Sequence, residues 1–135
     1  MKRKTLIVAG AILIMGVLSG RVVFAEGILD GKTYSGQVGE KDLPIGQAQR
    51  DDFVFNNGQF ASTLCQSFGY GEGSYEAVTN GDVVLFSAKT TRSDGGTKIW
   101  SGTIRNGDIQ GAIVTLESGT TTEGWFEGKE KELIK

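Results

Sequence analysis

The stretch from Thr97 to Glu117 consists of two alternating segments on either side of Asn106-Gly107. Asn-Gly between such segments is the strongest short-range signal for a two-residue β-hairpin, because both residues tolerate the positive φ that a type I′ turn needs. Pairing outward from this turn puts directly opposed residues on the same face of the ladder. One face then carries Trp100, Ile104, Ile109 and Ile113, with Gly102 opposite Gly111 between them. This hairpin therefore predicts a sheet with one buried side and one mostly solvated side.

The same alternation recurs along the chain and predicts eight strands joined by turns. Two more Asn-Gly pairs, at 57–58 and 80–81, predict hairpins of the same kind. Sequential hairpins form an antiparallel meander, and closing it into a barrel removes both exposed sheet edges. We therefore expect an all-β fold, an antiparallel up-and-down meander closed into a small eight-stranded barrel, with a β-sandwich as the alternative. The expected strands are 32–38, 52–56, 59–65, 74–79, 82–90, 97–105, 108–117 and 122–128.

Residues 1–25 have the pattern of an export signal. Three basic residues at positions 2–4 precede an apolar run over 6–18, and Ala25 ends a small-residue motif that suits cleavage. The sequence thus predicts a signal peptide over 1–25 and a single β-barrel domain over 26–135, located in the periplasm or outside the cell. An uncleaved N-terminal anchor is the alternative, although the apolar run is short for a membrane span.

The charge of the expected mature chain is negative. Residues 1–25 hold four of the 14 basic residues and no acidic ones, which leaves 10 basic against 16 acidic residues and a net charge of −6. This balance argues against nucleic acid and against an anionic membrane surface as partners.

The chain has no histidine and only one cysteine, Cys65. The lack of histidine excludes His-based acid–base catalysis, Ser-His and Cys-His nucleophiles and the commonest transition-metal ligand. A metal site would need carboxylates alone. We therefore expect no catalytic residues, no metal site and no cofactor. A lone thiol forms no intrachain disulfide, and we expect Cys65 to be buried, with pairing to a second chain as the alternative.

Acidic pairs are present, but their spacing does not favour catalysis. Asp51 and Asp52 are adjacent and would face opposite ways on a strand, whereas Glu123 and Glu127 would lie roughly 13 Å apart on one face. That separation is too large for the paired carboxylates of glycoside hydrolysis. We expect these acids to be solvated, and Glu72 is the single acid that we would test first.

Inward-facing aromatic residues are the candidate ligand contacts. The interior of an eight-stranded barrel can be filled by side chains or can hold one small ligand, so core packing and a ligand cavity both fit the pattern. The candidate ligand-binding residues are Tyr34, Phe55, Tyr75, Phe86 and Trp100. The glycine-rich loop 66–73, which carries two aromatic residues, either touches the ligand or packs over the barrel end.

Three short segments resemble the calycin-type barrels, which include lipocalins and avidins. WSG at 100–102 precedes LESGTTTEGW at 116–125, as similar motifs do in streptavidin-like proteins, and KTYSGQVG at 32–39 is similar to their first strand. The chain departs from that family in having only two tryptophans, Val114 near the position of an expected tryptophan, and no clear counterpart of the late aspartate that holds biotin. The resemblance therefore implies the architecture and not biotin binding.

These observations predict an exported small β-barrel that binds a small, partly apolar ligand in or at the mouth of the barrel. The alternative is a protein-interaction or inhibitor module without a ligand cavity, acting through the polar loop 39–50 or the turn 92–96. An enzyme is the least favoured reading, because recognisable acid–base groups are missing. The sequence makes no prediction of the oligomeric state.

Overall fold

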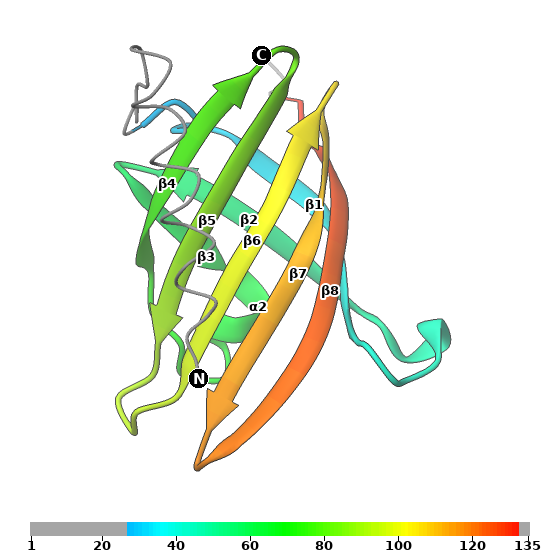
Figure 1. Cartoon of the computed structure of the whole chain (residues 1–135), viewed down its shortest axis with the longest axis vertical. Coiled ribbons are helices and arrows are strands. Elements are labelled where there is room, and N and C mark those ends of the chain that lie inside the picture. The colour runs from blue at the N-terminus through cyan, green and yellow to red at the C-terminus, as the bar shows by residue number, and fades with distance from the viewer. Residues whose placement is uncertain (1–26, 133–135) are drawn as a thin grey trace.

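The protein is an eight-stranded antiparallel β-barrel in a computed structural model that describes residues 27–132 (Figure 1). The predicted signal peptide lies outside these residues. Each strand pairs with the next, and β1 pairs with β8 to close the barrel, so the sandwich alternative is excluded. The strands are β1 (Thr33–Glu40), β2 (Gln49–Asn56), β3 (Gln59–Ser62), β4 (Gly73–Asn80), β5 (Val83–Thr91), β6 (Thr97–Arg105), β7 (Asp108–Glu117) and β8 (Thr120–Glu130).

The hairpin formed by β6 and β7 has the predicted register. Asn106 and Gly107 have φ values of 53° and 80°, and Trp100 pairs with Ile113. Gly102 and Gly111 are opposed in this register, and the Phe126 ring lies close to both: a Cβ at Gly102 would be 2.9 Å from that ring and one at Gly111 2.8 Å. The two glycines therefore make room for an aromatic side chain of β8 inside the barrel.

The hairpin formed by β4 and β5 turns one residue later than predicted. Asn80 pairs with Val83, so Gly81 and Asp82 form the turn, with a φ of 66° at Gly81. Glycine at the first central position is the requirement of a type II′ turn, which competes here with the predicted Asn-Gly turn. The sequence pattern puts Tyr75, Ala77, Val84, Phe86 and Ala88 on one face of this hairpin. All five do face the core; four are buried, and Val84 is partly buried against it.

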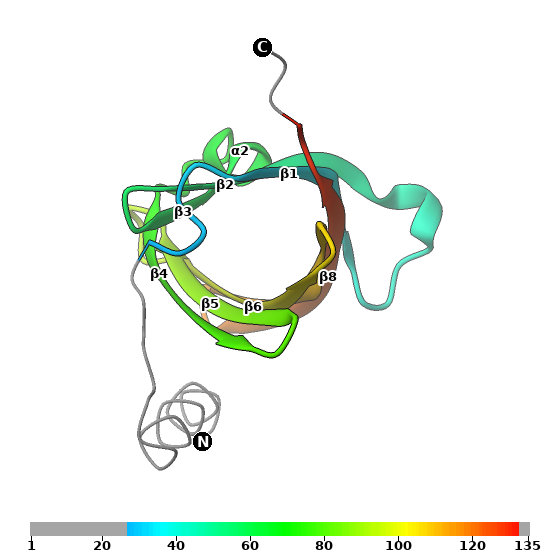
Figure 2. The same ribbon diagram turned by 90° about the horizontal axis from the view of Figure 1, so that it is seen from above.

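Two other segments differ from the sequence prediction. The predicted strand 59–65 ends at Ser62 and continues as a one-turn helix, α2 (Thr63–Gln66), while the loop after β1 contains a 3-10 turn, η1 (Ile45–Gln47). β8 is longer than predicted and begins directly after a turn at Ser118-Gly119, where both residues have positive φ. The view along the barrel shows that α2 lies outside the strand ring, and the loop containing η1 projects away from the wall (Figure 2).

Packed aromatic rings fill the interior of the barrel. Phe55 contacts the rings of Tyr75, Phe60 and Phe86 at centroid distances of 5.0, 5.1 and 5.2 Å. Trp100 contacts Phe60 at 4.9 Å and is fully buried. Of the two interpretations of the inward aromatics, core packing is therefore the one that the geometry supports.

One end of the barrel is covered by residues 27–32, which precede β1. Leu29 is buried, and its backbone N–H donates a hydrogen bond of 2.9 Å to the hydroxyl of Tyr75. The same hydroxyl donates to the carboxylate of Asp30 at 2.8 Å, and that carboxylate accepts the N–H of Gly58 at 2.9 Å. These bonds hold the segment across the end at which the β2–β3 hairpin turns. We call this the closed end and the opposite one the mouth.

Candidate functional site: a pocket at the barrel mouth

The mouth contains a pocket of about 550 Å³. It is bounded by the inner wall of the barrel, by the loop between β1 and β2, by α2 with the loop that follows it, and by the start of the β5–β6 turn. A volume of this size is within the range of small-molecule sites. Its apolar lining residues are Val38, Leu43, Leu64, Phe68 and Ile113, and its charged lining residues are Glu40, Arg92, Lys98, Glu117 and Glu123.

Exposed apolar side chains gather around this end of the molecule. Phe68 is 60% exposed and Leu43 44% exposed, and both line the pocket. Ile45 on the projecting loop is 71% exposed, and Leu116 lies near the end of β7. Single exposed apolar residues are normal, but a group of them beside a concave site is typical of a binding surface.

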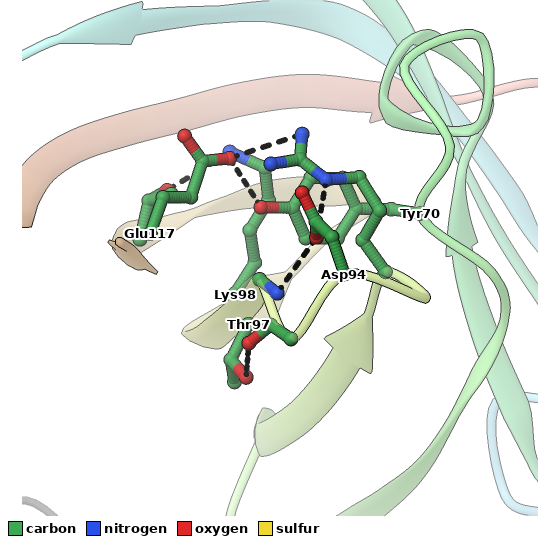
Figure 3. A network of polar contacts seen from close by, with 9 residues as sticks. Tyr70, Asp94, Thr97, Lys98 and Glu117 are labelled. Carbon is green, nitrogen blue, oxygen red and sulfur yellow. Dashed lines mark hydrogen bonds and ion pairs between the residues drawn. The ribbon is translucent and has the colours of Figure 1, made fainter. Parts of the chain in front are cut away.

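Tyr70 is the centre of a polar network on one wall of the pocket (Figure 3). It is buried, its hydroxyl donates to the carboxylate of Glu117, and burial together with this bond raises its pKa to about 12. Glu117 also pairs with Arg92 Nη1 at 3.3 Å, and Arg92 Nε donates to Asp94 at 2.9 Å. The network joins residues from the glycine-rich loop, the β5–β6 turn and the end of β7 into one rigid wall.

Two cations lie against the Tyr70 ring. The guanidinium carbon of Arg92 is 4.9 Å from the ring centroid, and Lys98 Nζ is 5.1 Å from it. Lys98 Nζ also donates a hydrogen bond of 2.8 Å to Thr115 Oγ1. Attraction of a cation to an aromatic face stabilises such an arrangement without neutralising the charge. Lys98 is thus positioned as a charged group on the pocket wall.

The backbone brings Tyr70 to this position. Tyr70 forms an isolated β-bridge with Arg92, and the N–H of Gly71 donates to the carbonyl of Thr91 at 3.0 Å. Gly96 leaves space for the phenol, because a Cβ there would lie 2.7 Å from the Tyr70 hydroxyl. The glycine-rich loop therefore packs over the mouth through Tyr70 and lines the pocket as well.

Cys65 lines the pocket because the chain turns into α2 directly after Ser62, and Cys65 lies in this helix. Ser62 is the N-cap residue of α2, and its hydroxyl accepts the N–H of Cys65 at 3.1 Å. Asp51 accepts the N–H of Leu64 at 2.9 Å and the hydroxyl of Ser62. Cys65 is buried as predicted, and burial raises the pKa of its thiol. Serine is a preferred N-cap residue, and a carboxylate near the first turn accepts its free N–H groups, so Ser62 and Asp51 together favour the start of α2 at this point.

The expectation that all the acids are solvated is wrong for Asp51. Asp51 is 4% exposed and faces inward, while Asp52 faces outward and accepts the hydroxyl of Ser35 at 2.6 Å. Burial raises the pKa of Asp51, although its hydrogen bonds act in the opposite direction. The opposed orientation of the two acids agrees with the prediction, but the sequence pattern did not show that one of them caps a helix.

The five candidate ligand-binding residues, Tyr34, Phe55, Tyr75, Phe86 and Trp100, all lie inside the barrel and are buried. The structure brings them into one aromatic core, and none of them is among the residues that line the mouth pocket. Contact of these five residues with a ligand stays a prediction.

The other acids that the sequence singled out lie at the surface. Glu72 is exposed and does not line the pocket, while Glu123 lies at the pocket rim and pairs with Lys41 at 3.0 Å. Sequence reasoning missed Lys98 and Glu117 as pocket residues. The strand alternation did contain a signal for them, since both residues continue the inward face of the hairpin formed by β6 and β7 toward the mouth.

Comparisons of the chain with protein-family models, with curated proteins and with solved structures return no match. Between residues 27 and 132, no group of three or more acidic or cysteine side chains is arranged to hold a metal ion. No helix in that part of the chain has the length and apolar character needed to cross a membrane.

Proposed function

We propose that the protein is a small binding barrel, of the calycin type, that holds a partly apolar ligand at its mouth. The observation that carries this proposal is a pocket of about 550 Å³ with apolar side chains on one side and a polar network on the other. The mouth is favoured over the interior because the rings of Phe55 and Trp100 are fully buried and occupy the space between the strands. The calycin assignment rests on the closed eight-stranded meander and on the short sequence motifs.

The proposed place of action is the periplasm or the outside of the cell. This part of the proposal rests on the basic and apolar pattern of residues 1–25. Fractionation of the native host, followed by mass determination of the mature protein, tests it. A mature N-terminus at Glu26 in the exported fraction is expected, and full-length protein in the cytoplasm would contradict it.

Binding at the mouth is tested with the neutral fluorescent probe N-phenyl-naphthylamine. We expect saturable binding with a rise in emission, and we expect Phe68→Ser to weaken it about tenfold, because burial of a phenyl ring on the probe is lost. Ile45→Ser is the matched control, because Ile45 is more exposed than Phe68 but does not line the pocket. Equal effects of both substitutions, or no saturable binding by the parent protein, would contradict a ligand site at the mouth.

A protein-interaction module is the second candidate function. It is favoured by the loop that joins β1 to β2, which projects from the wall and carries Ile45 at 71% exposure (Figure 2). In that case Ile45→Ser, and not Phe68→Ser, would reduce the capture of a partner by the purified protein. The two substitutions therefore distinguish the two functions: Phe68→Ser should affect ligand binding alone, and Ile45→Ser should affect partner capture alone.

A further inference from the structure

Lys98 is a cation that faces into the mouth pocket from the wall of the barrel. It lies on β6 two residues before Trp100 and therefore on the same face of the strand. Across the strand pair, Lys98 is opposite Thr115, whose hydroxyl it contacts at 2.8 Å, and Thr115 is in turn opposite Thr122. The ammonium thus contacts one hydroxyl group and the face of the Tyr70 ring.

The other charges near Lys98 are paired. Arg92 is bound by Asp94 and Glu117, and Glu123 by Lys41. Among residues 27–132, Lys98 has no carboxylate within ion-pair distance, and its contacts are a hydroxyl and an aromatic ring. A half-buried ammonium with neutral partners retains most of its capacity to bind an anion.

The remaining charge of the pocket is Glu40, at the end of β1. It is exposed, and β7 and β8 separate its strand from β6 around the barrel. Four of the five apolar lining residues, Val38, Leu43, Leu64 and Phe68, lie on β1, in the loop after it and in the α2 region, and the fifth, Ile113, lies on β7. The pocket therefore has a cationic wall on β6 and an apolar wall formed by other elements.

We propose that Lys98 anchors the anionic group of an amphiphilic ligand, an organic anion such as a carboxylate whose apolar body lies against Leu43 and Phe68. The proposal rests on the proposed function and names the chemical class of its ligand. Lys98 Nζ donates to the anion, and the hydroxyl of Thr115, which accepts a hydrogen bond from Lys98, can donate its own proton beside it. Charge-assisted hydrogen bonds of this kind are about twice as strong as neutral ones, so the anionic group sets the preference among ligands of equal apolar size.

The experiment compares three probes that share one apolar chain and differ in charge: octanoate, octanol and octylammonium. Calorimetric titration of the purified protein is expected to give the tightest binding for octanoate, about tenfold tighter than octanol, with octylammonium the weakest. Lys98→Met keeps the length of the stem and removes the charge, and it is expected to bring octanoate to within about twofold of octanol. Lys89→Met is the matched control, since it makes the same substitution at an exposed lysine of β5 that does not line the pocket, and it is expected to leave octanoate binding unchanged.

The outcomes separate this inference from the proposed function. Equal binding of octanoate and octanol by the parent protein, with both weakened by Phe68→Ser, would overturn the anion site and leave the mouth pocket in place. Tightest binding of octylammonium would show that Glu40 binds the charged group of the ligand, and it would overturn the role of Lys98. Failure of all three probes and of the neutral naphthylamine to bind would overturn both proposals. Should Lys98→Met not fold, as judged by thermal denaturation, Lys98→Gln and the order of the three probes with the parent protein decide.

Discussion

The indole Nε1 of Trp100 donates a hydrogen bond of 3.2 Å to the hydroxyl of Thr90, and both side chains are buried. Thr90 lies opposite Lys98 on the neighbouring strand, one layer nearer the mouth than Trp100. The pair therefore forms the boundary between the aromatic core and the pocket. A buried indole with a satisfied N–H combines a large apolar contact with no unpaired donor.

Trp100→Ala is expected to lower the free energy of unfolding by about 3–5 kcal/mol, because it removes a fully buried ring and leaves a cavity. Since small domains have only about 5–15 kcal/mol in total, the variant should be strongly destabilised in urea denaturation. Trp125→Ala is the control, because Trp125 is the only other tryptophan and lies half-buried on the outer face. A loss for Trp100→Ala as small as that for Trp125→Ala would show that the ring borders open space instead of the core.

Asp51 should make stability depend on pH in a direction unusual for an aspartate. Its pKa is raised by burial above the ordinary 3.8, so the folded state holds the proton more tightly than the unfolded state. Its contribution to the free energy of unfolding is therefore full below pH 3.8 and falls as the pH rises through the folded-state pKa. Urea denaturation of the parent and Asp51→Asn proteins at a series of pH values measures this difference. The parent is expected to lose stability relative to Asp51→Asn as the pH rises, and a parent that instead gained stability relative to the variant would contradict the raised pKa.

Asp51→Ala tests the role of the same residue as a helix cap. It removes the acceptor of the Leu64 N–H and is expected to destabilise the protein by about 1–2 kcal/mol at neutral pH. Asp51→Asn keeps one acceptor oxygen and is expected to cost less. Equal losses for the two variants would show that the carboxylate geometry, and not the acceptor, matters at this position.

The three tyrosines of the chain should titrate together at high pH. Burial is the largest cause that raises the pKa of Tyr34, Tyr70 and Tyr75 to about 12 in each case, whereas an unperturbed tyrosine has a pKa of 10.0. Tyrosinate absorbance is expected to be absent near pH 10 in the folded protein and present at that pH in urea. Because the folded state retains these protons longer, its stability is full below pH 10 and falls as the pH rises toward 12. Tyrosinate formation at pH 10 in the folded protein would refute the burial of these side chains.

Cys65 should react slowly with iodoacetamide at neutral pH. The thiolate is the reactive form, and burial raises the thiol pKa above its ordinary value of 9.0, so little thiolate is present. The labelling rate, followed by mass spectrometry, should rise with pH, and octanoate in the mouth pocket should lower it because Cys65 lines that pocket. The unfolded protein in urea provides the reference rate for the same thiol. A folded protein that reacts as fast as the unfolded one would contradict the position of Cys65 behind the mouth.

Local patterns determined much of the barrel. Alternation with a period of two set which residues of β6 and β7 face inward, and the Asn-Gly turns at 57–58 and 106–107 set the register of two hairpins. These features are predictable because the contacts within a hairpin join residues that are close together in the sequence. The turn after Asn80 was predicted one residue early because Gly81 suits two turn types, and the sequence contains no local feature that decides between them.

Tertiary structure alone decided where the pocket lies. Tyr70 and Glu117 are 47 positions apart, and they meet because the barrel closes with its loops on one end. The inward turn of Asp51, its contact with α2 and the coverage of the closed end by Leu29 likewise depend on strands that are distant in sequence. Alternation specifies which side of a strand is inside, but the height of a residue along the barrel follows from the stagger of all eight strands. For that reason the sequence predicted which aromatic side chains face inward, whereas the filled interior, Lys98 and the mouth pocket required the folded chain.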